Sequence, residues 1–376
     1  MSNFAEQTVR VAPPEVNFAT DHLLVSNVRF LSMAGVVLVH CISASFWLAG
    51  CRPEDWLERA IRQPVSFDVI GFFLISGFLM EEGLARRGPA EYLRRRLRRI
   101  ALPWLFWFSL YFAILITNDA LHGRLRFVSF QEGALSIVRK LIYSLLSNAY
   151  WFVPNLLIAL CILLACRRFR FDPRMVACAL FALSLFYGVN IHANWIPFQR
   201  HSEALFGFVF YLWLGQWGAR NSAAIQGWIS RISKRAIIAL GVLAGAAAFA
   251  ESSFLFTAGN PHPMNTLRIC NQLYAVILVV AIFMLRKPVW PRAVNVRATT
   301  FGVYLIHPIA IFILMNLIKR LIGGPLTGQP AGTAGAIAVC LSLCTFAAVY
   351  GGSLFLTKWL LDHPRLRWMV GAPLSN

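Results

Sequence analysis

Long apolar runs separated by short polar segments recur along nearly the whole chain. A helix needs about 20 mostly apolar residues to cross a hydrocarbon core roughly 30 Å thick, so runs of this length predict membrane spans. The pattern predicts ten such helices, at approximately residues 23–48, 64–82, 100–117, 150–166, 175–192, 204–218, 236–254, 269–285, 300–318 and 333–357. We therefore predict an all-α fold, a polytopic transmembrane helix bundle over residues 23–357 with no separate soluble domain.

Composition agrees with a chain that is embedded in lipid along its length. Apolar residues make up 58% of the 376 residues, charged residues only 14%, and the mean hydropathy is +0.62. Soluble proteins carry roughly a quarter charged residues. Because the apolar runs are spread along the chain, a single anchor attached to a soluble domain is excluded.

The net charge of +19 and the pI near 10.4 would also suit a nucleic-acid-binding protein. In a membrane protein, however, Lys and Arg gather in cytoplasmic loops. Ten spans place both termini on one side, and that side carries 24 of the 35 Lys and Arg residues, against 11 on the other. We therefore expect cytoplasmic tails at 1–22 and 358–376, with the lipid bilayer and no nucleic acid as a partner.

The eight cysteines show no spacing typical of metal ligands. None forms a CxxC pair, and most lie within the apolar runs. We interpret them as small buried hydrophobes and expect no metal site.

The segment 118–149 is the longest one on the predicted outer side and is too charged to span in full. Apolar positions at Ile137, Leu141, Tyr143, Leu145 and Leu146 indicate an amphipathic helix within it. Such a helix either lies in the membrane interface or packs on the surface of the bundle.

The first predicted span carries two ionisable residues, Arg29 and His40. Their separation of eleven residues corresponds to about 16 Å and three turns of helix, so both face one side of it. Ionisable residues inside a membrane are candidate functional residues. Alternatively, Arg29 extends to the cytoplasmic interface, and His40 makes a structural hydrogen bond to a neighbouring helix.

In the second span, Gly71 and Gly77 would allow close approach of a neighbouring helix. An arginine cluster follows this span. Arg94, Arg95, Arg98 and Arg99 are its candidate ligands for the phosphates of a cytosolic donor, because guanidinium groups bind phosphate well. The cluster is equally explained as a topology signal, and the two interpretations are compatible.

A second histidine, His307, lies inside a later apolar run. If that helix packs beside the first, His40 and His307 would frame one polar cavity. Tyr150 and Trp151 are typical of an interfacial aromatic belt. The outer loop 192–203 contains Trp195, Gln199, Arg200 and His201, which suit either a sugar surface or a loop that is simply wetted.

Five motifs in this order resemble the acyltransferase-3 family, bacterial membrane O-acyltransferases of surface polysaccharides, exopolysaccharides and related glycans. They are Arg29-x10-His40, FFLISGF at 72–78, YLRRRLRRIALPW at 92–104, WFVPNLL at 151–157 and YLIHP at 304–308. Many relatives carry an acidic or small residue where this chain has Ile70, and no family role passes to Asp68.

The resemblance implies transfer of an acyl group, usually acetyl from acetyl-CoA, to a sugar hydroxyl. Arg29 and His40 match the family's essential pair, acyl-CoA is a donor substrate, and no permanently bound cofactor is implied. The implied setting is a multi-pass protein of the bacterial inner membrane, with a glycan acceptor and, as an open possibility, polysaccharide synthesis or secretion machinery as partners. Acetyl and succinyl both fit, and the acceptor glycan stays open.

Physical chemistry is compatible with this assignment. Histidine suits the removal of a proton from a sugar hydroxyl because its ordinary pKa is close to working pH. Negative charge that develops on the thioester oxygen needs a nearby cation or donor. Arg29 would supply it or hold a CoA phosphate, and His40 would act as general base or as an acyl relay.

Two rival functions use the same features. A transporter or flippase for a glycan also has buried charges and ten spans, but such proteins often show helices interrupted by Gly or Pro in paired positions, which we do not expect here. A structural subunit of a polysaccharide-secretion system would tolerate substitution of Arg29 and His40.

Overall fold

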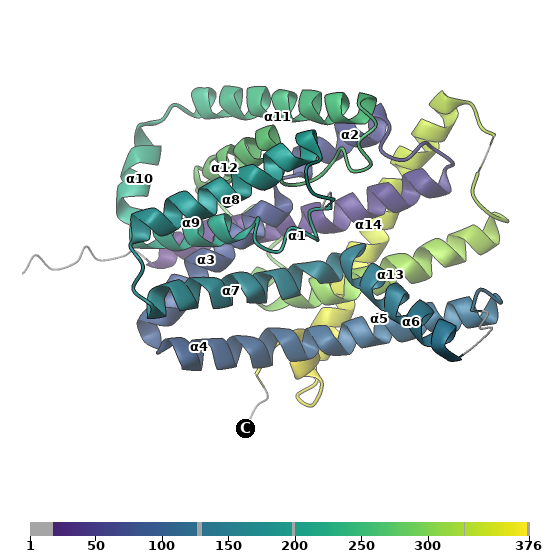
Figure 1. The fold of residues 1–376 in the computed structure, drawn as a ribbon, viewed down its shortest axis with the longest axis horizontal. Helices are drawn as coiled ribbons and strands as arrows, with labels where there is room; N and C mark the ends of the chain where they lie inside the picture. The colour runs from purple at the N-terminus through teal and green to yellow at the C-terminus, as the bar shows by residue number, and fades with distance from the viewer. Residues whose placement is uncertain (1–17, 126–129, 198–199, 327, 374–376) are drawn as a thin grey trace, which may run out of the picture.

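The structure, a computed structural model, describes residues 18–125, 130–197, 200–326 and 328–373, and these residues form helices joined by turns and loops without any strand. The long helices are α1 (Phe18–Leu48), α3 (Asp68–Arg86), α5 (Leu102–Leu121), α7 (Phe152–Arg168), α8 (Pro173–Ala193), α11 (Lys234–Thr257), α13 (Val296–Leu321) and α14 (Ala331–Asp362). The shorter ones are α2 (Trp56–Arg62), α4 (Pro89–Arg96), α6 (Phe130–Leu146), α9 (Val209–Arg220), α10 (Ser222–Arg231) and α12 (Ile269–Phe283). Single turns are η1 (Gln63–Val65), η3 (Ala149–Trp151) and η4 (Arg367–Val370), with a π-helical turn η2 (Leu97–Ala101). Most helices lie side by side along one direction (Figure 1), which confirms the predicted all-α bundle.

Eight helical runs among the described residues are long and apolar enough to cross a membrane, judged by length and composition. Three of them contain more than one helical element. The run Trp56–Arg86 continues from α2 through η1 into α3, and the run Pro89–Leu121 continues from α4 through η2 into α5. The run Ala149–Arg168 continues from η3 into α7. The eight runs correspond to eight of the ten predicted spans.

The other two predicted spans form short helices, α9 with 12 residues and α12 with 15. Each follows a non-helical segment, 200–208 before α9 and 258–268 before α12, that contains buried residues such as Phe208 and Leu267. Non-helical backbone is tolerated at membrane depth only where protein surrounds it or it lines a cavity. Segments of this kind were not expected from the sequence, and they bring loop side chains into the bundle.

The side chains that face away from the bundle are largely apolar. Val242 and Leu243 of α11 are 66% and 67% exposed, and Phe355 of α14 is 72% exposed. Apolar surface of this extent marks contact with lipid or protein rather than with water. The bundle is therefore a multi-pass membrane structure.

The expectation that the cysteines are buried was wrong for most of them. Cys41 is buried. The other seven are partly exposed (Cys51, Cys166 and Cys270) or exposed (Cys161, Cys178, Cys340 and Cys344). The apolar runs that contain them include the lipid-facing sides of helices, and apolarity alone does not distinguish a lipid-facing position from a core position.

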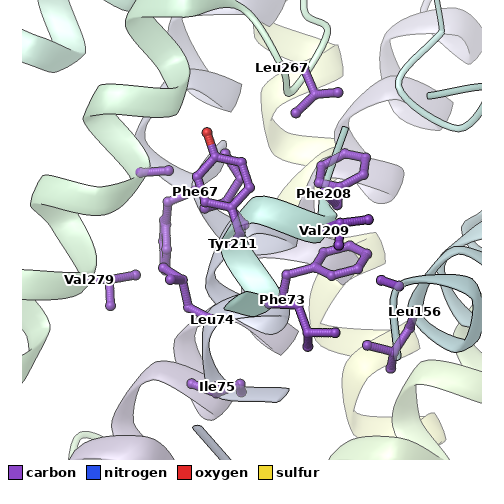
Figure 2. Packing of buried hydrophobic residues seen from close by; sticks show 14 of the residues in the cluster. Phe67, Phe73, Leu74, Ile75, Leu156, Phe208, Val209, Tyr211, Leu267 and Val279 are labelled. Carbon is purple, nitrogen blue, oxygen red and sulfur yellow. The ribbon is translucent and has the colours of Figure 1, made fainter. Parts of the chain in front are cut away.

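Close packing of α3 against α9 forms part of the larger core cluster, shown in Figure 2. A Cβ atom on Gly77 would collide with the carbonyl of Leu212, and one on Gly215 would collide with the carbonyl of Leu74. The rings of Phe73 and Phe208 stack with centroids 4.8 Å apart. The close approach predicted at Gly77 is confirmed, because only a residue without a side chain fits there.

Helix α6 lies on the bundle beside α5, to which an ion pair between Lys140 and Asp119 connects it. Its residues Ile137 and Leu141 remain exposed. This arrangement combines the two alternatives left open for the segment, since the helix packs on the bundle and still presents an apolar face outward.

Most of the arginine-rich segments meet at one end of the bundle, at the left in Figure 1. There lie the turn between α3 and α4, the turn between α7 and α8, and helix α10. We call this the basic end, defined by residues 86–99, 167–174 and 220–235. The loop 49–55, which follows α1, lies toward the opposite end.

Candidate active site

A cavity of about 580 Å³ lies among α1, α3, η2, the start of α7 and the first turns of α13. Its wall also includes His201 and Thr266, which come from the two buried segments before α9 and α12. The interrupted spans therefore contribute side chains to this cavity directly. A cavity of this volume is large enough for a small-molecule substrate.

Arg29 and His40 both line the cavity, as their spacing on one face of the first helix predicts. Their separation of eleven positions places the two side chains about 16 Å apart along α1. Neither side chain is fully buried, because each is open to the cavity. Arg29 lies nearer the start of α1 and His40 nearer its end.

His307 lies beside His40, with ring centroids 5.6 Å apart. It comes from α13, is fully buried, and is not part of the cavity wall. Its Nδ1 lies 3.2 Å from the carbonyl of Val303 and donates to it, while Nε2 has no hydrogen-bond partner among the described residues. The predicted pairing of the two histidines is thus present, but only His40 is open to a substrate.

Arginine side chains surround the end of the cavity where Arg29 lies. They come from four elements and are Arg29 of α1, Arg96 of α4, Arg99 of η2 and Arg297 of α13. The π-helical turn η2 follows α4 directly, and such turns occur frequently at functional sites. Four positive charges at one mouth suit a polyanionic ligand.

Only one of the four arginines predicted to bind a phosphorylated donor lines the cavity. That residue is Arg99, whereas Arg94, Arg95 and Arg98 are absent from the wall, although all four are exposed. Arg95 instead pairs with Glu91 at 2.8 Å, one helical turn away. Sequence adjacency did not separate these residues, because helical rotation turns neighbouring side chains in different directions.

The other end of the cavity contains Ser43, Arg62 and His201. Arg62 is held by Glu58 at 3.1 Å and by Glu54 at 3.5 Å. Burial in the first place, and then the nearby Arg62 guanidinium, lower the pKa of His201 from 6.5 to about 3. His201 is therefore neutral at working pH, able to donate and to accept a hydrogen bond.

The aromatic residues before α7 are buried inside the bundle rather than exposed in an interfacial belt. Tyr150 is fully buried, and its hydroxyl donates to the carbonyl of Leu305 at 2.9 Å. Trp151 is 6% exposed, lines the cavity, and contacts His201 with ring centroids 4.9 Å apart. The belt interpretation was therefore wrong for this pair.

Residues of the outer loop 192–203 lie in different environments in the structure. His201 lines the cavity, whereas Trp195 is 66% exposed and Arg200 donates to the hydroxyl of Ser147 at 2.9 Å. Gln199 lies outside the described residues. Of this loop, His201 is the residue brought to the site.

Several cavity residues were not selected from the sequence. One is Arg297, which lies ten residues before the selected His307 on α13, much as Arg29 lies eleven before His40 on α1, and this spacing was the available signal. Asp68, at the first turn of α3, is 5% exposed and lines the cavity, but a lone carboxylate carries no spacing signal. Among the described residues, no group of three His, Cys, Asp or Glu side chains is placed to hold a metal ion.

A family model described as an acyltransferase domain matches residues 25–345, which includes Arg29, His40, the arginine cluster and His307. The chain belongs to the acyltransferase-3 family. No curated protein and no solved structure matches the chain. It is therefore a membrane O-acyltransferase that acts on groups other than amino-acyl groups, and the cavity is the candidate active site of this acyltransferase.

Proposed function

We propose that this acyltransferase moves an acyl group, acetyl in the first instance, from acyl-CoA to a sugar hydroxyl of a surface polysaccharide or exopolysaccharide. The observation that carries the proposal is the single cavity that has four arginines at one end and His40 further along. The phosphates of the donor need the cationic groups, and the hydroxyl of the acceptor needs a base such as His40. One cavity that contains both allows transfer without a mobile carrier.

The donor enters from the basic end. Coenzyme A carries phosphate groups, and Arg96, Arg99 and Arg297 surround the mouth of the cavity there. Arginine binds phosphate through charge-assisted and often bidentate hydrogen bonds. With the phosphates held at this mouth, the thioester extends along the cavity towards His40.

His40 acts as the general base in the direct mechanism. It takes the proton of the sugar hydroxyl as that oxygen attacks the thioester carbonyl, which forms a C–O bond and a tetrahedral oxyanion. The intermediate then collapses with cleavage of the C–S bond, and the proton passes from His40 to the departing CoA thiolate. The products are an O-acyl sugar and free CoA.

Arg29 orients the donor near the start of α1. At about 16 Å from His40 along the helix it suits a CoA phosphate better than the reacting carbonyl. A covalent acyl-histidine relay uses the same residues, with His40 Nε2 or Nδ1 attacking the thioester and the sugar oxygen attacking the acyl-imidazole. Detection of an acyl-enzyme in the absence of acceptor distinguishes the relay from direct transfer.

The excess of Lys and Arg on the basic end supports a cytoplasmic location for that end and for both termini. The setting we propose is the bacterial inner membrane. Acyl-CoA is then available at the arginine mouth, and the glycan reaches His40 from the other side.

The test uses membranes that contain the wild-type protein, radiolabelled acetyl-CoA, and surface glycan extracted from cells that lack the gene. We expect label in the glycan and stoichiometric release of CoA, together with loss of glycan esters in the deletion strain. Substitution of succinyl-CoA identifies the acyl group. Glycan translocation without consumption of either donor would identify a transporter instead and would contradict the proposal.

A further inference from the structure

A second cavity, of about 510 Å³, lies at the end of α1 that is remote from the basic end. Its wall is formed by the last turns of α1, by α2 and its preceding loop, by the last turn of α11 and by the segment that follows it. Ser43 and Arg62 line both this cavity and the one that holds His40. The two cavities are therefore neighbours that share part of one wall.

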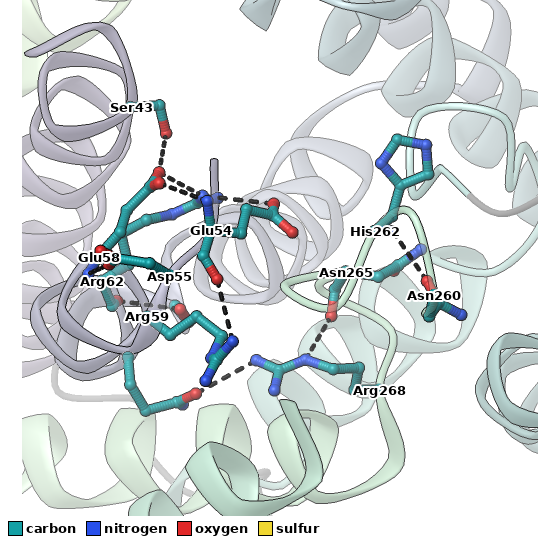
Figure 3. Close-up of polar contacts among 12 residues, drawn as sticks. Ser43, Glu54, Asp55, Glu58, Arg59, Arg62, Asn260, His262, Asn265 and Arg268 are labelled. Carbon is teal, nitrogen blue, oxygen red and sulfur yellow. Dashed lines mark hydrogen bonds and ion pairs between the residues drawn. The ribbon is translucent and has the colours of Figure 1, made fainter. Parts of the chain in front are cut away.

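The shared wall is a polar partition. Ser43 donates to Glu58 Oε1 at 2.9 Å, and Arg62 pairs with the same oxygen at 3.1 Å. Glu58 is 3% exposed, so the partition is a desolvated network rather than a surface ion pair (Figure 3). Ser43 follows His40 by three residues, less than one helical turn, so a group that passes the partition arrives beside the imidazole.

The rest of the second cavity combines aromatic faces with charged groups. Trp47, at the end of α1, is 53% exposed, and the ring of Phe256 is covered by the guanidinium of Arg52 at 4.6 Å from its centroid. Glu54 lines the cavity as well, and its backbone has φ of 54°. A non-glycine residue in this region costs free energy, and such strain clusters at ligand-binding sites.

The strained Glu54 backbone is held by its neighbours. Its N–H donates to Glu58 Oε2 at 2.7 Å, and its carbonyl accepts from Arg59 at 3.0 Å. These bonds fix the position of the Glu54 carboxylate at the cavity wall. An aromatic face beside fixed carboxylate and guanidinium groups suits a sugar ring, whose C–H face packs on the aromatic ring while its hydroxyls bond to the charged groups.

We propose that the second cavity is the acceptor subsite of the acyltransferase, that it binds a sugar ring of the glycan, and that Trp47 is its aromatic anchor. This inference rests on the proposed function, because it assigns a place to the acceptor of that reaction. The hydroxyl to be acylated reaches His40 past Ser43 and Arg62. Acceptor and donor thus approach the imidazole from opposite ends and do not compete for space.

The test measures acyl transfer from radiolabelled acetyl-CoA to surface glycan from gene-deletion cells, at varied concentrations of each substrate. Trp47→Ala should lower kcat/KM for the glycan about tenfold and leave the KM for acetyl-CoA unchanged. Trp47→Phe should retain most of the wild-type value, because it keeps an aromatic face. Trp56→Ala is the matched control, since Trp56 of neighbouring α2 is 65% exposed and lines neither cavity.

Three outcomes would contradict the assignment of the acceptor subsite. A Trp47→Ala enzyme with the same kcat/KM for glycan as Trp56→Ala overturns the assignment of the subsite. Equal losses for glycan and for acetyl-CoA also overturn it, because they indicate a general structural role. Absence of any transfer by the wild-type protein refutes the proposed function itself, and the subsite falls with it.

Discussion

The imidazole rings of His40 and His307 lie 5.6 Å apart although they come from helices at opposite ends of the chain. His307 is fully buried and directs Nδ1 to the carbonyl of Val303. Its ring is therefore fixed, and it limits where the His40 ring can lie. We interpret His307 as a positioning residue for His40.

Replacement of His307 tests this role. His307→Phe keeps an aromatic ring but removes the hydrogen bond to Val303, so we expect kcat to fall about tenfold or more while both KM values stay near wild type. His307→Gln retains a polar donor and acceptor and should keep more activity than His307→Phe. Steady-state kinetics in membranes measure both. If His307→Phe kept wild-type kcat, or more activity than His307→Gln, ring packing rather than the hydrogen bond to Val303 would position His40.

Removal of the base should stop the reaction without loss of the donor site. We expect His40→Ala to lower kcat by about 10²–10⁴-fold, the usual contribution of a positioned general base or acid. Binding of acetyl-CoA, measured by isothermal titration on purified protein, should persist because the arginine mouth is intact. Full glycan acetylation by correctly inserted His40→Ala protein would exclude the residue as base or relay.

Substitution of an arginine that lines the cavity should raise the KM for acetyl-CoA more than substitution of one that does not. Arg99→Ala removes the charge-assisted hydrogen bond that we propose to a CoA phosphate; such a bond contributes about 1.5–3 kcal/mol, so the KM for acetyl-CoA should rise roughly tenfold or more. Arg94→Ala is the control, because Arg94 is exposed and outside the cavity wall. Equal effects of the two substitutions would show that overall basic charge, not contact with the donor, sets donor affinity.

The sequence predicts the helices well because hydrophobic periodicity and length are local properties. It also predicts that Arg29 and His40 share a face, since α-helix geometry relates positions eleven residues apart. The short helices α9 and α12 were not expected, because burial of the segments before them depends on neighbours that are distant in the chain. Local hydropathy does not distinguish such a segment from part of an ordinary membrane span.

The same limit applies to the site. His201 and Trp151 meet with ring centroids 4.9 Å apart, yet one lies in a loop and the other in a turn, and no spacing rule relates them. Arg99 and Arg94 belong to one basic run, but the Arg99 side chain on η2 reaches the cavity wall and the Arg94 side chain on α4 does not. Residues on one helix could be related from the sequence, whereas contacts between elements required the structure.

Acid should destabilise the protein partly through His201. Its folded pKa of about 3 lies below the ordinary value of 6.5, so as pH falls the unfolded chain binds the proton first. The free energy of unfolding then declines by up to about 1.4 kcal/mol per pH unit between these two values, and stability from this group is complete only above pH 6.5. His201→Gln should reduce this slope, measured as thermal unfolding midpoints in detergent at pH 7.5, 6 and 5.

The control for that experiment is His122→Gln, because His122 is exposed. It should leave the slope unchanged. If His201→Gln and wild type lost stability in parallel between pH 6.5 and 5, burial of the neutral imidazole would not contribute to acid sensitivity.

The contact between α3 and α9 should be the most sensitive packing site to a single added methyl group. Gly77→Ala places a Cβ against the carbonyl of Leu212, where only movement of the helix backbone gives relief, so we expect a loss of about 1–3 kcal/mol in the free energy of unfolding. Gly351→Ala in α14 is the matched control, because no atom lies within 4 Å of its added Cβ. That control should be neutral or stabilising by up to about 1 kcal/mol, since alanine has a higher helix propensity than glycine. Unfolding in a mixed-detergent titration measures both, and equal stabilities of the two variants would show that α3 and α9 separate without cost.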